Sequence, residues 1–171
     1  MSRKKRTRSD LLKYQQGHKK HFADHAYGDA NLGKFINYVM WDGKKTIAEN
    51  IVYSALEKVA EDLKSNVIDI FYDVLNRIAP VVILKSRRFS GATYQVPTSI
   101  RPERGMSLAM KWIVSFARKK SQSGKTMIEG LILEFSLAHK GDPSSGALKK
   151  AEEVKKMVEA NKAYSHLSDV P

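Results

Sequence analysis

The hydrophobic pattern of the chain changes its period once, and this change limits the folds open to it. From about residue 29 to residue 164, apolar residues recur at spacings of three and four, which is typical of helices that bury one face. Between Pro80 and Pro97 this spacing gives way to the largely β-branched run 81–84 and a returning strand at 93–96. The sequence therefore predicts a mainly α-helical fold with one β-hairpin at about residues 81–100.

Six helices account for the rest of this pattern. Asp29 is a predicted cap for the first, and Thr46 with Glu49 forms a predicted capping box for the second. The last helix, from about Leu148 to Tyr164, is highly charged and has a thinner apolar stripe. The predicted buried face of the second helix holds Ile47, Ile51, Ala55, Leu56, Val59 and Leu63.

Length and composition favour one compact domain preceded by a basic arm. The chain has 171 residues, of which 42% are hydrophobic, and this is enough for a packed core. It has no cysteine, which excludes a disulfide framework and thiolate zinc sites, and no apolar run approaches the roughly 18 residues of a membrane span. We expect residues 1–28 to form a flexible arm and residues 29–171 a single helical domain.

The positive charge is concentrated in three stretches of the chain. There are 30 lysines and arginines against 18 acidic residues, a net charge of +12. Residues 1–20 hold eight of these cations against one acid, residues 85–104 hold five against one, and residues 111–125 hold five and no acid. Clustering of this kind indicates a polyanionic partner, with a solvated basic face as the alternative.

Nucleic acid is the polyanion that these residues suit best. Lysine and arginine release counterions from phosphates, and arginine also stacks on bases. A buried hairpin would not carry Lys85, Arg87 and Arg88 together near its tip, so we expect this hairpin to project, with Tyr94 as a candidate for stacking on a base. The charges alone do not separate RNA from DNA. A helical DNA-binding regulator is the alternative, although the sequence offers no dimerisation stripe.

No arrangement of side chains predicts an enzyme or a metal site. The segment 123–126, Ser-Gly-Lys-Thr, is similar to the end of a phosphate-binding loop, but Lys119 stands where that motif needs its first glycine. His18, His21 and His25 are spaced by three and four residues, yet a flexible arm without cysteine favours RNA contact or solvation over metal binding. We predict no catalytic residue, metal or cofactor.

Several short segments between about Gly28 and His166 form a distinctive series. They are KFIN (34–37), MWDGKKTIAE (40–49), IVYSALE (51–57), KSRR (85–88), GATYQVP (91–97), RPER (101–104), LAMKWI (108–113) and MVEANKAYSH (157–166). In this order they resemble the family of the seventh protein of the small ribosomal subunit, in its bacterial and organellar-type branch.

The resemblance implies a bundle of six helices with a protruding β-hairpin, in agreement with the helices inferred from periodicity. It implies a structural part of the small ribosomal subunit that binds its ribosomal RNA directly and nucleates assembly of the 3′ major (head) domain. It also implies a place near the exit-site tRNA and the mRNA path, with the eleventh and ninth proteins of the subunit as neighbours. Enzymatic activity, a membrane and a free homo-oligomer are not expected.

The residues expected to contact RNA combine this resemblance with the charge pattern. For ribosomal RNA they are Arg3, Lys4, Lys5, Arg6, Arg8, Lys44, Lys45, Arg101, Arg104, Lys111, Arg118, Lys119 and Lys120, and for RNA or tRNA at the hairpin they are Lys85, Arg87, Arg88 and Tyr94.

Two features bear on the compartment. The hairpin tip, residues 89–91, and the last residues, 167–171, depart from the family pattern, and such drift with a lysine-rich composition resembles organelle-encoded members. The start of the chain and the segment 101–104 are similar to alphaproteobacterial forms. We therefore expect a mitochondrial ribosome first, with the bacterial cytoplasm or a plastid as alternatives.

Overall fold

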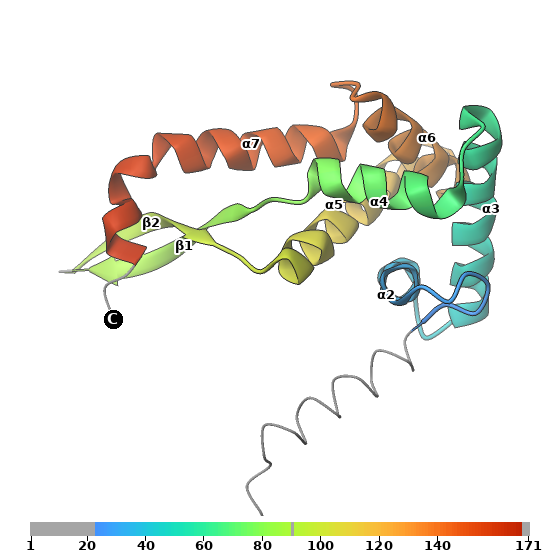
Figure 1. Cartoon of the computed structure of the whole chain (residues 1–171), viewed down its shortest axis with the longest axis horizontal. Coiled ribbons are helices and arrows are strands. Elements are labelled where there is room, and N and C mark those ends of the chain that lie inside the picture. Colours follow the sequence, from blue (N-terminus) through green and yellow to red (C-terminus); the bar gives the residue numbers. More distant parts are fainter. Residues whose placement is uncertain (1–22, 90, 169–171) are drawn as a thin grey trace, which may run out of the picture. The chain divides into compact units, whose positions relative to one another are not determined.

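The structure is a computed structural model that describes residues 23–89 and 91–168. These residues form six α-helices, one antiparallel pair of strands and a 3-10 helix (Figure 1), which confirms the predicted fold class. The predicted flexible arm falls mostly on residues outside the described range. The chain divides into two compact units, residues 1–50 and 51–171, and the division falls within helix α3.

In the first unit, ordered packing begins before the first helix. Asp24 is buried, and its two carboxylate oxygens accept hydrogen bonds from the backbone N–H groups of Tyr27 and Asp29, each at 2.7 Å. Helix α2 (Ala30–Val39) then starts with Asp29 as its N-cap, as predicted, because the Asp29 side chain accepts from the N–H of Leu32. Residues 24–29 are therefore part of the fold, although the predicted arm extended to residue 28.

Helix α3 (Lys45–Leu63) differs from the prediction in its start and in its buried face. It begins at Lys45, so Thr46 lies inside the first turn and the predicted capping box is wrong; Glu49 forms an ion pair with Lys45 at 3.5 Å instead. Ile47 was expected to be buried but is 56% exposed. The buried side chains, at the i, i+4, i+7, i+8 and i+11 positions of one face, are Ala48, Val52, Ala55, Leu56 and Val59.

Four helices of the second unit pack around a shared core. They are α4 (Val67–Ile78), α5 (Pro102–Gln122), α6 (Met127–Lys140) and α7 (Gly146–Ala160). Helix α4 contacts the other three, α5 contacts α6 and α7, and the rings of Phe71 and Phe135 lie 6.4 Å apart in the core. Helices α5 and α6 approach closely: a Cβ at Gly130 would lie 2.5 Å from the carbonyl oxygen of Ala117.

The ends of these helices follow their local sequence. Helix α4 stops before Pro80, and α5 has Pro102 in its first turn, as predicted. Thr126 and Glu129 form a capping box for α6. The last predicted helix is shorter than expected, because α7 ends at Ala160 and a 3-10 helix, η1 (Lys162–Ser168), follows.

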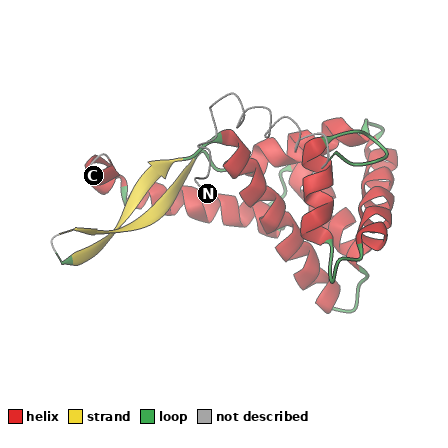
Figure 2. Cartoon of the chain, turned by 90° about the horizontal axis from the view of Figure 1, so that it is seen from below, coloured by secondary structure: helices red, strands yellow, loops and turns green. Residues whose placement is uncertain are grey.

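The predicted hairpin is confirmed as strands β1 (Val82–Phe89) and β2 (Ala92–Ser99). Phe89 pairs with Ala92, and Gly91 at the turn has a φ of +86°, which favours glycine. Both views show the hairpin extending beyond the ends of α4 and α5, with α7 alongside it (Figures 1 and 2). Strand β1 contacts α7, and β2 contacts η1.

Candidate nucleic-acid interface

The register of the hairpin gives its outer half two different faces. Side chains alternate along a strand, so the pairs Lys85–Val96 and Arg87–Tyr94 share one face, while Ser86–Gln95 and Arg88–Thr93 share the other. On the first face Val96 is fully buried, and the ring of Tyr94 lies 5.3 Å from the ring of Tyr164 in η1. We call this the covered face and the other the open face.

The open face is polar and exposed. Ser86, Arg88, Thr93 and Gln95 are all exposed, and the Gln95 side-chain amide donates to the Ser86 hydroxyl at 2.9 Å. This cross-strand bond joins two hydrogen-bonding side chains on the same face of the hairpin as Arg88. Such a face can contact phosphates and base edges together.

The structure divides the three predicted hairpin cations between the two faces. Arg88 lies on the open face, whereas Lys85 and Arg87 lie on the covered face, where Lys85 is exposed and Arg87 is half-buried. Tyr94 was expected to stand exposed among arginines, but it is half-buried against Tyr164. Sequence reasoning missed this contact, because the two tyrosines are far apart in the chain. Contact of Tyr94 with RNA stays a prediction.

Helix α5 separates its apolar face from its cations. Its buried residues include Ala109, Met110, Ile113, Val114 and Ala117. The predicted cations lie on other faces or, for Arg101, at the N-cap: Arg101, Arg104, Lys111 and Lys119 are exposed, and Arg118 and Lys120 are half-buried.

Two cations near the end of α5 have different surroundings. The Lys119 ammonium lies over the Phe116 ring, 5.0 Å from its centroid, and remains at the surface. The Lys120 ammonium lies 2.6 Å from a carboxylate oxygen of Glu134, which is fully buried on α6. The structure therefore gives Lys120 a part in folding that its neighbour does not share.

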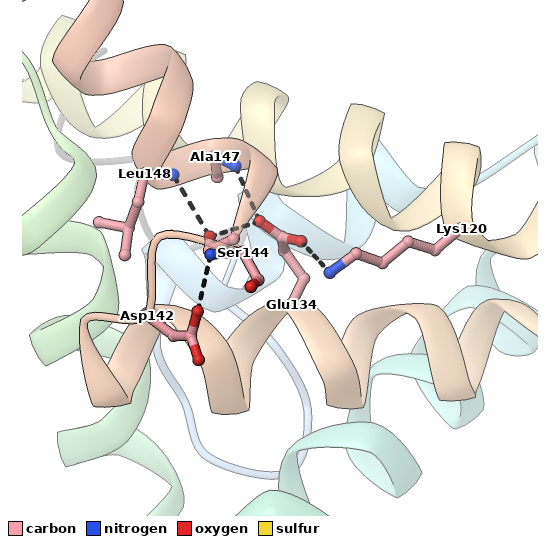
Figure 3. A network of polar contacts seen from close by, with 7 residues as sticks. Lys120, Glu134, Asp142, Ser144, Ala147 and Leu148 are labelled. Atoms are coloured by element: carbon pink, nitrogen blue, oxygen red, sulfur yellow. Dashed lines mark hydrogen bonds and ion pairs between the residues drawn. The ribbon is translucent and has the colours of Figure 1, made fainter.

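Glu134 joins three helices of the second unit (Figure 3). One of its carboxylate oxygens pairs with Lys120 of α5, and the other accepts from the Ser145 hydroxyl at 2.7 Å and the Ala147 N–H at 2.8 Å. Ser145 is in turn the N-cap of α7, so the buried carboxylate lies at a helix N-terminus, where negative charge is favoured. Sequence reasoning missed Glu134. The signal in the sequence was its position: counted from Leu131, Glu134 falls at i+3, Phe135 at i+4 and Ala138 at i+7, which is the spacing of one buried helix face.

In the first unit, the predicted residue Lys44 lies on the turn between α2 and α3, and the predicted residue Lys45 is the first residue of α3. Both are exposed, and Lys45 pairs with Glu49. The same turn carries Trp41, which is 70% exposed and which sequence reasoning did not single out.

The remaining predicted features either lie outside the described residues or have a structural role. Arg3, Lys4, Lys5, Arg6 and Arg8 lie outside the described residues, as do His18 and His21. The phosphate-loop-like segment 123–126 supplies the Thr126 cap of α6. Within residues 23–89 and 91–168, no three histidine, aspartate or glutamate side chains are grouped to hold a metal ion. No helix in that range has the length and apolar character needed to cross a membrane.

The fold and its charges define a class: a basic, mainly helical protein with a cation-bearing β-hairpin. Comparison with known proteins names the family. Residues 11–162 match the family described as ribosomal protein S7p/S5e, and the chain belongs to this family. The predicted resemblance is therefore confirmed, and the chain is a ribosomal protein of the small subunit and not an enzyme.

Three similar proteins are each named small ribosomal subunit protein uS7. They come from Pseudomonas fluorescens SBW25, with 50% identity, Pseudomonas syringae pv. syringae B728a, with 51%, and Marinobacter nauticus, with 49%. Each alignment spans 143 residues, 84% of this chain and 89% of the relative. All three organisms are bacteria, so these relatives give no support to the predicted mitochondrial location.

Proposed function

We propose that this protein binds small-subunit ribosomal RNA directly and helps to nucleate folding of the head domain. Family membership places it in the small subunit, and the observation that carries the RNA-binding role is the pair of exposed cationic surfaces in the second unit. These surfaces are the outward residues of α5 and the open face of the hairpin. Cations exposed in this way contribute little to folding but can neutralise phosphates.

The two surfaces have different tasks in this proposal. The exposed cations of α5 and of its N-cap contact ribosomal RNA, assisted by the basic N-terminal residues. They are Arg101, Arg104, Lys111 and Lys119. The open face of the hairpin, with Arg88, contacts RNA near the exit-site tRNA and the mRNA path. The eleventh and ninth proteins of the subunit are the proposed protein neighbours. We propose a ribosome of the bacterial type, in keeping with the relatives compared.

Binding of the full chain to a head-domain fragment of small-subunit RNA, at several salt concentrations, tests this function. We expect affinity to fall steeply with salt, with a slope of roughly 0.7–0.9 for each phosphate contact. The triple variant Arg101→Ala, Arg104→Ala, Lys111→Ala should lower the slope by about two to three and leave the fold intact. Equal binding of the wild type to an unrelated RNA hairpin or to duplex DNA would contradict the proposal, and the second result would favour the DNA-binding alternative.

A second experiment tests whether the protein is part of the small ribosomal subunit in the cell. Sedimentation of a native extract should show it migrating with the small ribosomal subunit. Recovery only in light fractions would contradict a structural role in the ribosome.

A further inference from the structure

The turn that joins α2 to α3 has a defined backbone. Asp42 and Gly43 have φ values of +51° and +72°, and the Lys44 N–H donates to the carbonyl oxygen of Trp41 at 3.0 Å. Two consecutive positive φ values closed by this bond are typical of a type I′ turn, which is tight and needs such residues. The Met40 N–H donates to the carbonyl oxygen of Ile36 in α2, and the Ala48 N–H in α3 donates to the carbonyl oxygen of Lys44. The backbone of Trp41 is therefore held on both sides.

The side chain at this held position is a large aromatic group that faces water. Trp41 is 70% exposed, whereas tryptophan is mostly buried on average in folded proteins. Burying such a ring would remove a large apolar area from water, so leaving it exposed on a tight turn favours a role in binding. The other tryptophan of the chain, Trp112, is half-buried on α5.

The residues around Trp41 favour a nucleotide over an apolar protein surface. Lys44, on the same turn, and Lys45, the first residue of α3, are both exposed and lie within four residues of Trp41 in the sequence. The Lys45 ammonium pairs with Glu49, so Lys44 is the cation that we assign to the ligand. An aromatic face beside cations is the arrangement with which proteins bind single-stranded nucleic acid, because the base stacks on the ring while the cation meets its phosphate. Asp42 is the one acid in the turn, and its left-handed φ is a conformation that aspartate tolerates better than most residues.

We propose that Trp41 is a stacking platform for an unpaired base of the bound RNA, with Lys44 on a neighbouring phosphate. This inference rests on the proposed RNA-binding function and adds to it a base-contacting residue in the first unit. Because stacking uses the π-face that every base has, Trp41 contributes affinity with little dependence on sequence.

Fluorescence of Trp41 tests the contact directly. In the variant Trp112→Phe, which keeps an aromatic ring at the half-buried site, Trp41 is the remaining tryptophan. Titration with the head-domain RNA fragment should quench its emission in step with binding. Binding without any change in emission would overturn the inference and leave the proposed function standing.

Affinity measurements in the wild-type background give an independent test. Trp41→Leu should weaken binding about tenfold without changing the salt slope, whereas Lys44→Ala should lower the slope by about one. Ile47→Ala is the matched control, since Ile47 is an exposed apolar residue of the same unit and should have no effect. If Trp41→Leu binds RNA as the wild type does and instead loses a ribosomal protein partner, the base-stacking assignment is wrong. If the wild type fails to bind the RNA, the proposed function falls as well.

Discussion

Lys120 of α5 and Arg88 of the hairpin were both predicted to contact RNA, and the structure gives them different environments. Lys120 lies 2.6 Å from the fully buried carboxylate of Glu134, at the junction of three helices. Arg88 is exposed on the open face of a two-stranded sheet, among polar neighbours. Both count equally in the net charge of +12.

The difference shows that a cation's role depends on where its counter-charge lies. A lysine opposite a buried carboxylate compensates a charge that water cannot reach, so its removal should weaken the fold. The charge of a surface arginine is already solvated by water and screened by salt. Its removal should therefore leave the stability of the fold unchanged and weaken the binding of a polyanion. Stability and RNA affinity measured on the same variants separate the two roles.

The largest effect is expected from Lys120→Met, which keeps the length and apolar stem of the side chain but leaves Glu134 buried without its cation. Breaking such a pair costs about 3 kcal/mol of unfolding free energy, at the low end of the range because 26% of the Lys120 side chain is exposed. Urea denaturation measures it. Lys119→Met, at the next position, is the matched control and should change stability by less than about 1 kcal/mol.

The same pair of variants also separates the two roles in RNA binding. Lys119→Met should reduce the salt slope, while Lys120→Met, measured where it is folded, should not. The reverse pattern would show that Lys120 serves RNA and that its contact with Glu134 is incidental.

A smaller loss of stability is expected from Gly130→Ala, which tests how tightly the junction is packed. The added Cβ would lie 2.5 Å from the backbone oxygen of Ala117, so α5 and α6 would have to separate. We expect a cost of about 1–3 kcal/mol in urea denaturation, as for other overpacked cores. Ser136→Ala, at a half-buried position of the same helix, is the control. An unchanged urea midpoint for Gly130→Ala would mean that α5 and α6 can separate at this point without loss of stability.

At the hairpin, Arg88→Ala should weaken binding to RNA by about fivefold and change unfolding free energy by less than about 0.5 kcal/mol. Arg87→Ala is the contrasting variant, because Arg87 is half-buried on the covered face beside Tyr94. It should have the smaller effect on RNA affinity. Equal losses from both variants would show that RNA approaches both faces. Unfolding of the double variant would show that the hairpin is packed rather than projecting.

Much of the fold could be predicted because its signals are local. The hairpin follows from a β-branched run between two prolines, and Asp29 and Pro102 mark helix starts by chemistry that operates within one turn. Helix α3 shows the limit. The faces that begin at Ile47 and at Ala48 are both apolar, and periodicity alone does not choose which of them is buried.

The candidate site was less predictable, because its details depend on residues far apart in the chain. Glu134 is buried with its charge because Lys120 and Ser145 come to it from other helices. Tyr94 loses its predicted exposure because Tyr164 lies against it. Positive stretches could therefore be located by counting, but the cations available to a ligand could be identified only from the packing.

The smallest predicted effect concerns the linker before α7, where the charge of one aspartate is stabilised chiefly by a backbone hydrogen bond. The Asp142 carboxylate accepts from the Ser144 N–H at 2.7 Å, and this bond, followed by the Ser144 side chain and Lys140, lowers the pKa of Asp142 below its ordinary value of 3.8. A lowered pKa stabilises the fold above the ordinary value, and this contribution is lost as pH falls through the folded-state pKa.

Asp142→Asn should therefore be slightly less stable than the wild type at pH 5–7, and the difference should shrink below about pH 3.8. Urea denaturation of both proteins at pH 7, 5 and 3 measures this. A difference that is the same at all three values would mean that the charge of Asp142 does not contribute to stability.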